Sequence, residues 1–308
     1  MIINEKRILF TLLLCVVLFA VFAHSGLKAD DLVLEKANDD FVIGLIPERN
    51  IFKQLARYEP LMQYLSKVIN KRIKTTVLTR YGNIIENFID NKMDAAFFGS
   101  FSYVLTHAQL EIEPIARPLL LNGRSTYSGF LFVRRDSDIA SVSAMKGKRF
   151  VFVDKATTAG FLFPLGYLKD HGVTDYKNYF SEIYFAGTHE YAIYDVLNKK
   201  ADIGAAKNTI YESLAEKDER IYKELVILEK STPVPENALA VKPEIDPLLK
   251  RKLKDALLNL HEEPSGQKIL QQLGAERFIE TTDQDYAGVY VHINKINFDL
   301  KNYKYLNN

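Results

Sequence analysis

Residues 153–164 read Val153-Asp-Lys-Ala-Thr-Thr-Ala-Gly-Phe-Leu-Phe-Pro164, a stretch in which a buried strand ends and a helix begins. The mostly apolar run Arg149–Val153 is typical of a strand, and the residue pattern from Gly160 to His171 predicts a helix. Pro164 is tolerated because it falls in the first turn of that helix. A strand that passes directly into a helix is the building unit of an α/β fold with parallel strands.

The same alternation continues on both sides of this stretch. Upstream strands are predicted at residues 41–46, 73–78, 95–98 and 127–133, and the helices between them at 51–69, 84–89 and 103–110. Downstream strands are predicted at 183–185, 202–206, 225–228 and 238–241, and helices at 191–197, 210–217, 248–260 and 267–273. Two α/β cycles predict two similar lobes with a ligand cleft between them, each lobe a mostly parallel sheet flanked by helices.

The connector Thr232-Pro-Val-Pro-Glu236 returns the chain from the second lobe to the first, and its prolines keep it extended. We therefore expect lobe 1 to comprise residues 30–130 plus 234–308 and lobe 2 to comprise residues 131–233. The tail at 286–308 is rich in Tyr, Asn and Lys, and no pattern assigns it to a helix or a strand.

The N-terminal segment has the pattern of an export signal. Lys6 and Arg7 precede an apolar run at residues 8–23, which fits the core of a signal peptide and is short for a membrane span. We expect residues 1–29 to be a signal peptide or an N-terminal anchor, and both interpretations place the remaining chain in the periplasm. The single cysteine, Cys15, follows Leu14, which is not the small residue that a lipoprotein signal requires.

The amino-acid composition excludes several classes of protein. The 308 residues include 40 Lys plus Arg and 39 Asp plus Glu, a formal net charge of +1, so no nucleic-acid partner is expected. The 47% apolar and 26% charged residues are typical of a globular chain rather than a disordered one. One cysteine allows neither an intrachain disulfide nor a multi-cysteine zinc site.

Sequence motifs of catalysis are missing. The pairs His189-Glu190 and His261-Glu262 lack the second histidine of a zinc-protease helix, and neither a Gly-x-Ser-x-Gly elbow nor a Gly-x-x-x-x-Gly-Lys phosphate loop occurs. We therefore expect the protein not to be an enzyme and to need no metal and no cofactor.

Thr157 and Thr158 lie where the strand gives way to the helix. A helix N-terminus leaves unpaired N–H groups and carries about half a positive charge, which favours an anion. The two hydroxyls add donors, and Gly160 would let a ligand approach the backbone closely. Simple capping of the helix by a threonine accounts for the same residues equally well.

Three more residues are candidates for the same site. His189 also lies where a strand passes into a helix, and its ring can donate a hydrogen bond to an oxyanion. Tyr81 and Tyr127 carry phenols that can close over a small ligand. The ordinary alternatives are a capped or surface histidine and packed tyrosines.

The ordered set of motifs resembles the periplasmic substrate-binding proteins of phosphonate, phosphite and phosphate ABC importers. The resemblance runs from about Phe41 to Phe278. It rests on short segments: Gly44-Leu-Ile-Pro47, Tyr58-Glu-Pro-Leu61, Met93-Asp-Ala-Ala-Phe-Phe-Gly-Ser100, Gly147-Lys-Arg-Phe-Val-Phe152, Thr157-Thr-Ala-Gly160, Gly187-Thr-His189, Ala201-Asp-Ile-Gly204 and Ser231-Thr-Pro-Val-Pro235.

The resemblance implies the two-lobed type 2 fold of periplasmic binding proteins. It implies a monomer that captures a small phosphorus oxyanion in the inter-lobe cleft and delivers it to an ABC permease in the membrane. A ligand-sensing domain that signals to a membrane histidine kinase or cyclase is the alternative, and a periplasmic enzyme is a weaker one.

The resemblance also implies which residues bind the ligand. The family's Ser-Thr-Ser turn corresponds to Thr157, Thr158 and Ala159, so one of three hydroxyls is lost. The family histidine corresponds to His189. The tyrosines that line the cleft correspond to Tyr81 and Tyr127.

The remaining expected ligand-binding residues are Ser100, Lys207, Thr209 and Asn237. Family members that take aminophosphonates place carboxylates against the ligand's ammonium. Thr209 and Asn237 align with those carboxylates, with Glu236 one residue away and Lys207 close by. A buried ammonium without a carboxylate partner is costly, so the expected ligand carries no amine, as in phosphate, phosphite or a simple alkylphosphonate.

Overall fold

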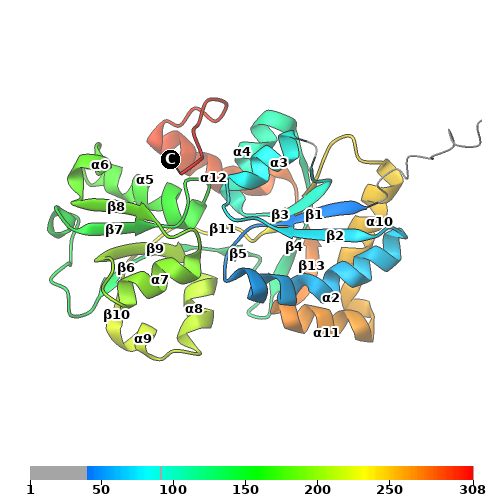
Figure 1. The fold of residues 1–308 in the computed structure, drawn as a ribbon, viewed down its shortest axis with the longest axis horizontal. Coiled ribbons are helices and arrows are strands. Elements are labelled where there is room, and N and C mark those ends of the chain that lie inside the picture. Colours follow the sequence, from blue (N-terminus) through cyan, green and yellow to red (C-terminus); the bar gives the residue numbers. More distant parts are fainter. Residues whose placement is uncertain (1–39, 91, 308) are drawn as a thin grey trace, which may run out of the picture. The chain divides into compact units, whose positions relative to one another are not determined.

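The computed structural model describes residues 40–90 and 92–307 (Figure 1). The expected signal peptide or anchor, with Cys15, lies outside the described residues. No helix in the described ranges is both long enough and apolar enough to cross a bilayer.

The first sheet has six strands in the order β13-β4-β12-β3-β1-β2 (Figure 1). Their bounds are β1 (Phe41–Leu45), β2 (Ile73–Val77), β3 (Ala95–Phe98), β4 (Glu113–Leu120), β12 (Ala238–Val241) and β13 (Ala275–Glu280). Strand β1 pairs in parallel with β2 and β3, whereas β12 runs antiparallel to β3 and β4, and β13 antiparallel to β4.

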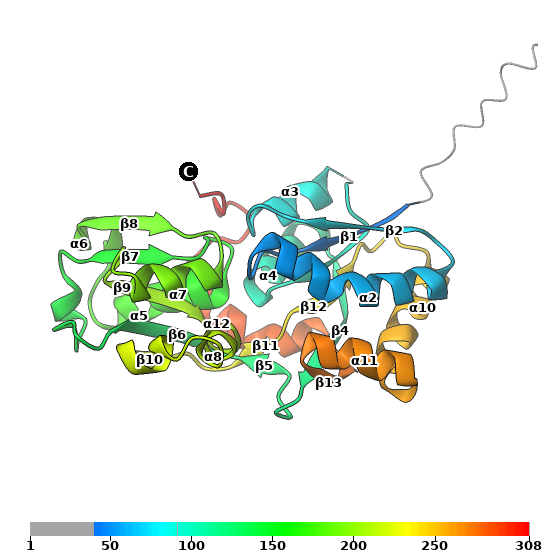
Figure 2. The ribbon, with the colours of Figure 1, turned by 60° about the horizontal axis from the view of Figure 1, so that its bottom comes forward.

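Helices cover both faces of this sheet because its buried strands are apolar on both sides. Ala95 and Phe97 of β3 pack with α2 (Ile51–Ile69), α10 (Pro247–Leu258) and α11 (Pro264–Leu273). The alternate residues Ala96 and Phe98 face α3 (Asn83–Ile89) and α4 (Ser100–Leu110). Figure 1 shows α3 and α4 above the strands β1 and β2 and α2 and α11 below them, and Figure 2 shows the same elements after a turn of 60°.

The second sheet has five strands in the order β10-β6-β9-β7-β8. Their bounds are β6 (Gly129–Arg134), β7 (Arg149–Phe152), β8 (Glu182–Phe185), β9 (Ile203–Lys207) and β10 (Leu225–Lys230). Strand β7 is parallel to β8 and β9, and β6 is antiparallel to β9 and β10.

This sheet is also covered on both faces. One face packs against η1 (Ser143–Met145), α5 (Phe163–Asp170) and α6 (Tyr176–Tyr179). The other packs against α7 (His189–Leu197), α8 (Asn208–Ala215) and α9 (Arg220–Glu224). The fold is therefore a two-lobed α/β fold in which each lobe is built on one sheet.

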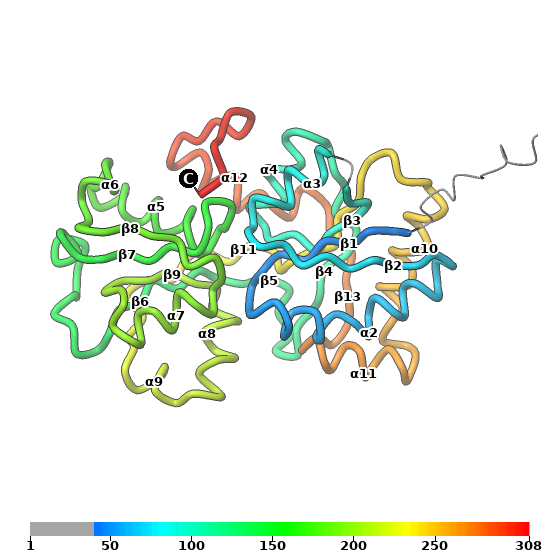
Figure 3. Tube along the Cα trace, in the orientation of Figure 1, coloured from blue at the N-terminus to red at the C-terminus, as the bar shows by residue number. Residues whose placement is uncertain are grey.

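Each sheet is mixed rather than mostly parallel. The expected parallel strands are present as β2-β1-β3 and β8-β7-β9, and antiparallel strands extend each set. Strands β4 and β13 were not predicted, because two prolines and Arg117 interrupt the apolar pattern of β4 and few residues of β13 are buried. A two-stranded antiparallel ladder, β5 (Thr126–Tyr127) with β11 (Val234–Pro235), lies where the chain passes from one sheet to the other, as the trace in Figure 3 shows.

The C-terminal segment contains η4 (Asp283–Tyr286), helix α12 (Ala287–Ile296) and an irregular tail. The tail binds residues beside both sheets. The Asn307 amide donates to Asp154 Oδ2 at 2.8 Å, Lys155 Nζ donates to the Leu306 carbonyl at 2.8 Å, and Arg80 donates to the Asn307 carbonyl at 2.9 Å. These contacts order the segment that the sequence pattern left unassigned.

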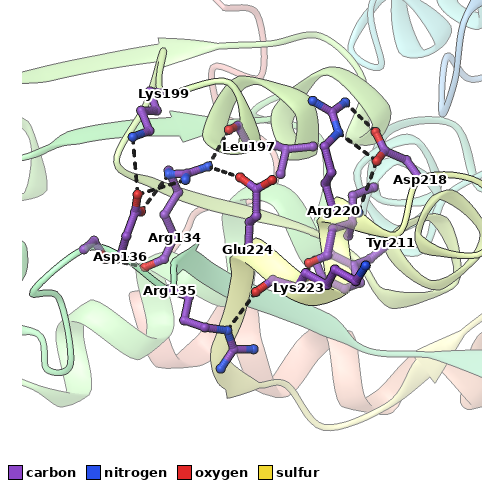
Figure 4. A network of polar contacts seen from close by, with 12 residues as sticks. Arg134, Arg135, Asp136, Leu197, Lys199, Tyr211, Asp218, Arg220, Lys223 and Glu224 are labelled. Atoms are coloured by element: carbon purple, nitrogen blue, oxygen red, sulfur yellow. Dashed lines mark hydrogen bonds and ion pairs between the residues drawn. The ribbon is translucent and has the colours of Figure 1, made fainter.

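A polar network joins β6, α7 and α9 of the second lobe (Figure 4). The Arg134 guanidinium donates to the Leu197 carbonyl at 2.6 Å, to Glu224 Oε2 at 3.0 Å and to Asp136 Oδ1 at 2.8 Å. Nearby, the Tyr211 hydroxyl of α8 donates separately to the Ile221 carbonyl of α9 at 3.2 Å. Three acceptors on one guanidinium hold the end of β6 against the helices that cover it.

Candidate functional site

A small cavity of about 10 Å³ lies where three helices begin, and we call it the small cavity. Gly99 precedes α4, Thr157 precedes the helical turn η2 (Thr158–Leu162) that continues into α5, and Thr188 precedes α7. Each helix follows the carboxyl end of β3, β7 or β8. Helix starts carry unpaired N–H groups and partial positive charge. The volume is close to what one water molecule needs, so the site suits a small polar group.

The small cavity has a mixed polar lining drawn from both lobes. Its lining residues are Ile46, Glu48, Tyr81, Gly99, Tyr127, Ala156, Thr157, Thr158, His189, Lys207 and Asn237. Seven of the ten predicted ligand-binding residues are in this set.

The two threonines at the start of η2 play different parts. Thr157 Oγ1 donates to the Asp154 carbonyl at 2.6 Å, and no hydrogen bond from its side chain caps the helix. The Thr157 hydroxyl proton is therefore used in a hydrogen bond to the backbone. Thr158 Oγ1 is buried and has no hydrogen-bond partner among the described residues. The Thr157 side chain therefore does not cap the helix, and the Thr158 hydroxyl is left as an unpaired donor.

Tyr81 is a second buried donor without a partner. Its side chain is 2% exposed, and its hydroxyl makes no hydrogen bond within the described part of the chain. Buried hydroxyls are nearly always paired because an unmade hydrogen bond costs about 1–3 kcal/mol. Two unpaired hydroxyls on one small cavity indicate a ligand that accepts hydrogen bonds.

His189 is the first residue of α7 and is neutral in this site. Its Nδ1 accepts a hydrogen bond from the backbone N–H of Lys207 at 3.2 Å, which leaves Nε2 as the protonated, donating nitrogen. Burial lowers the pKa of His189 to about 3, although the Glu48 carboxylate acts in the opposite direction. The ring edge also contacts Tyr81, with ring centroids 5.9 Å apart. His189 therefore offers a neutral N–H donor at physiological pH.

The buried His189 predicts a specific loss of stability in acid. The unfolded histidine titrates near its ordinary value of 6.5 and the folded one near 3, so below pH 6.5 the unfolded state binds the extra proton. The stability that His189 contributes is present above pH 6.5 and is lost as the pH falls toward 3. Between about pH 6 and pH 4.5, urea unfolding measures how steeply the free energy of unfolding falls with falling pH. We expect this fall to be steeper in wild type than in His189→Asn by up to about 1.4 kcal/mol per pH unit. Equal slopes would contradict a buried neutral histidine.

Tyr127 and Ser100 form a hydrogen-bonded pair. Ser100 Oγ lies 2.7 Å from the Pro235 carbonyl and 3.0 Å from the Tyr127 hydroxyl. The carbonyl can only accept, so Ser100 donates to it and the Tyr127 phenol donates to Ser100. Both hydroxyl protons are used within the protein. Tyr127 lines the small cavity, whereas Ser100 does not line it and contacts it only through its hydrogen bond with Tyr127.

Lys207, at the end of β9, carries a buried ammonium with four polar or aromatic neighbours. Its Nζ lies 2.9 Å from Glu48 Oε1, 2.5 Å from Glu236 Oε2 and 3.3 Å from Asn237 Oδ1. The same nitrogen lies 4.4 Å from the centroid of the Tyr127 ring. The side chains of Lys207, Glu48 and Glu236 are only 4%, 4% and 6% exposed. This ion cluster joins the second sheet to the first.

The charges of this cluster stabilise one another. Burial would lower the pKa of Lys207, but the carboxylates of Glu236 and Glu48 outweigh it and hold that pKa above its ordinary value. Burial would likewise raise the pKa of Glu48, yet the Lys207 ammonium and the Arg57 guanidinium outweigh it and lower the pKa to about 2. Lys207 and Glu48 are both charged at neutral pH.

A larger cavity of about 300 Å³, which we call the large cavity, is also lined by residues of this cluster. It is lined by α2, the β4–β5 turn, α8 and the end of α11, and its lining includes Arg49, Arg57 and Thr209. Glu48, Lys207 and Asn237 line both cavities. Thr209 therefore lies with the large cavity and not with the small one.

Two further residues that the sequence suggested for the site, Ala159 and Gly160, are buried. Ala159 is buried beside Thr158 but does not line the small cavity. A Cβ on Gly160 would lie 2.4 Å from Val153 Cβ, so this glycine is needed for close packing of the helix on the end of its own strand. No cluster of His, Cys, Asp and Glu within residues 40–90 and 92–307 could hold a metal ion.

Sequence reasoning missed Glu48. It follows β1 directly after the segment Gly44-Leu-Ile-Pro47, and a charged residue just beyond a buried strand was the available signal. Carboxyl ends of parallel strands gather at one edge of a sheet, where ligands bind in open α/β folds.

Comparison with known proteins gives the same family. The sequence profile described as "ABC transporter, phosphonate, periplasmic substrate-binding protein" matches residues 43–286, well over half of the chain. The chain is 27% identical over 294 residues to the "Phosphate-import protein PhnD" of Mycolicibacterium smegmatis, which covers 89% of this chain and 91% of that protein. It is 25% identical over 256 residues to the "Phosphonates-binding periplasmic protein" of Escherichia coli, covering 81% and 73%.

A solved structure shares the fold. PhnD1 of Prochlorococcus marinus, in complex with methylphosphonate, superposes with a TM-score of 0.74 at 21% identity and covers 84% of this chain and 99% of that one. Because the profile match spans both sheets and the residues around the small cavity, the chain belongs to the family of periplasmic substrate-binding proteins of phosphonate ABC transporters.

Proposed function

We propose that this protein captures a small phosphorus oxyanion, namely phosphate, phosphite or a simple phosphonate, in the small cavity and delivers it to an ABC importer. The observation that carries the proposal is the pair of buried hydroxyls, Tyr81 and Thr158, that have no hydrogen-bond partner within the described residues. They line the small cavity together with the N–H of a neutral His189. An oxyanion satisfies all three donors at once.

The electrostatics of the small cavity support an anion. The net charge of the whole chain is only +1, so attraction must be local. Three helix starts supply partial positive charge and backbone N–H groups. Hydrogen bonds from such neutral donors to a charged oxygen are strong in a site that excludes water. The names of the relatives, which refer to phosphate import and phosphonate binding, point to the same ligand class.

Hinge motion of two lobes is the mechanism that we propose for capture. Lobe 1 would comprise residues 30–130 plus 234–308 and lobe 2 residues 131–233, with β5 and β11 at the hinge. The Lys207–Glu48 pair and the Lys53–Glu190 pair at 2.8 Å connect elements of the two sheets. A ligand bound to the helix starts favours the closed form because it adds contacts that only closure completes. The closed monomer would then dock on the permease.

Export is the remaining part of the proposal. Residues 1–29 would direct the chain to the periplasm as a cleaved signal or hold it there as an anchor. N-terminal sequencing of the exported protein distinguishes the two. A start near residue 30 supports a free binding protein, and an intact start supports an anchored one.

Ligand binding is tested by calorimetry and thermal shift with phosphate, phosphite, methylphosphonate, 2-aminoethylphosphonate and sulfate. We expect at least one amine-free phosphorus oxyanion to bind, and a ligand at 100 times its dissociation constant to stabilise the protein by about 2.7 kcal/mol. Sulfate serves as the control for a simple anion of similar size. The proposal is wrong if no phosphorus oxyanion binds, or if 2-aminoethylphosphonate binds more tightly than the three amine-free ligands.

A further inference from the structure

The surroundings of Lys207 Nζ have the composition of a binding site for a ligand's ammonium. Two carboxylates and one amide oxygen lie within 3.3 Å of the nitrogen, and an aromatic ring lies 4.4 Å away. Carboxylates and aromatic faces are the groups by which proteins recognise organic cations. Glu236 Oε1 is also buried and has no hydrogen-bond partner in the described part of the chain, so the cluster keeps one spare acceptor.

The position of this cluster ties it to the ligand. Lys207, Glu48 and Asn237 line the small cavity, where the oxyanion is proposed to bind, and they also line the 300 Å³ large cavity. The Lys207 side chain is therefore part of the wall between the two cavities. A substituent that extends from a bound phosphorus oxyanion toward the large cavity passes the residues that line both cavities, which include the Lys207 ammonium.

We propose that Lys207 is the specificity-determining residue that excludes amine-bearing phosphonates, because its own ammonium occupies the subsite that a ligand's ammonium would need. This inference rests on the proposed function and deepens it. A second ammonium would meet a like charge and two carboxylates that are already paired. An oxyanion without an amine benefits from the same lysine, which neutralises carboxylates that would otherwise repel it.

Removal of the Lys207 side chain is therefore expected to strengthen binding of aminoalkylphosphonates and to weaken binding of methylphosphonate. In Lys207→Ala the two carboxylates face an empty space that is open to the large cavity. An aminoalkylphosphonate can then place its phosphonate on the helix starts and its ammonium on Glu48 and Glu236. Methylphosphonate loses the neutralising charge and meets the carboxylates directly.

Calorimetry on wild type and K207A with methylphosphonate and with aminomethyl-, 2-aminoethyl- and 3-aminopropylphosphonate tests this exchange. We expect K207A to bind at least one amine about tenfold or more tightly than wild type does, and to bind methylphosphonate about tenfold or more weakly. The matched control is the triple variant K207A/E48Q/E236Q, which has the same opening but no carboxylates. It should show no gain for any amine.

A second measurement does not depend on phosphorus ligands. Ethylammonium chloride should raise the melting temperature of K207A relative to sodium chloride at equal ionic strength, and it should not do so for the triple variant or for wild type. If K207A does not fold, K207A/E236Q relieves the repulsion between the carboxylates while Glu48 remains to bind an ammonium. The same comparisons are then made with that variant.

The outcomes separate the two proposals. If wild type binds no phosphorus oxyanion but ethylammonium stabilises K207A, the proposed function fails and the ammonium subsite stands. If K207A keeps wild-type affinity for methylphosphonate, gains nothing for any amine and shows no stabilisation by ethylammonium, the inference about Lys207 is overturned and the proposed function is untouched.

Discussion

Replacing Lys207 by methionine is expected to lower the free energy of unfolding by about 3–5 kcal/mol at neutral pH. Methionine keeps most of the volume of the lysine side chain and removes its charge. Glu48 and Glu236, whose side chains are 4% and 6% exposed, are then left buried without their cation. Removal of one partner of a buried ion cluster costs far more than the cluster contributes as a whole, because the remaining charges stay desolvated.

The pH dependence of the stability lost in K207M shows how much of the loss comes from unpaired charge and how much from altered packing. In wild type the folded pKa of Glu48 is lowered from 4.5 to about 2, since the attraction of Lys207 and Arg57 outweighs the effect of burial. The stability that comes from this shift is present above pH 4.5 and is lost as the pH falls toward 2. In K207M the Glu48 carboxylate is buried without the lysine that opposes the effect of burial on its pKa, so the lowering of the Glu48 pKa is diminished and less stability is lost as the pH falls. We therefore expect the difference between the two proteins to shrink in acid.

Chemical unfolding of ligand-free protein at about pH 7 and pH 4.5 measures both effects. The triple variant K207M/E48Q/E236Q is the control, because neutral amides replace the unpaired carboxylates, and it should recover most of the lost stability. A K207M protein within about 1 kcal/mol of wild type at neutral pH would mean that the cluster is solvated or open in solution.

Tyr81→Phe and Thr158→Val are expected to weaken ligand binding without weakening the fold. Each removes a hydroxyl that the described residues leave unpaired and that we propose donates to the oxyanion. A hydrogen bond to a charged group contributes about 1.5–3 kcal/mol, so each variant should lose about 10- to 150-fold in affinity. In the ligand-free state the same hydroxyl is a buried, unsatisfied group, so its removal should leave the melting temperature unchanged or raise it.

Tyr211→Phe is a matched control for this pair of effects. Tyr211 is also a buried tyrosine, but its hydroxyl donates to the Ile221 carbonyl at 3.2 Å and it lines neither cavity. Y211F should therefore lower stability and leave affinity unchanged. Calorimetry with the tightest phosphorus ligand and thermal unfolding without ligand give the two quantities. If Y81F and T158V lose stability and keep affinity, the two hydroxyls are structural and the oxyanion does not bind there.

Local sequence patterns were enough to predict the strand-to-helix units and the residues at their junctions. Thr158 and His189 could be found because a helix start after a buried strand is a local feature, and both lie on the small cavity. The strands β4 and β13 could not be found in this way. Pro114, Pro118 and Arg117 interrupt the pattern of β4, and its pairing with β12 and β13 is set by residues more than 100 positions away.

The sequence by itself determined the α/β class, the order of most elements and the junction residues, because these depend on apolar spacing and helix starts over a few residues. Only the tertiary structure decided what Lys207 does. The resemblance to the family placed Thr209 and Asn237 opposite a ligand's amine. The fold instead brings two carboxylates onto the Lys207 ammonium: that of Glu48, which is 159 residues away in the sequence, and that of Glu236, which is 29 residues away. Charges that are so far apart in the sequence attract strongly only when folding brings them together and removes the water between them. A pattern over a few neighbouring residues cannot predict such a contact.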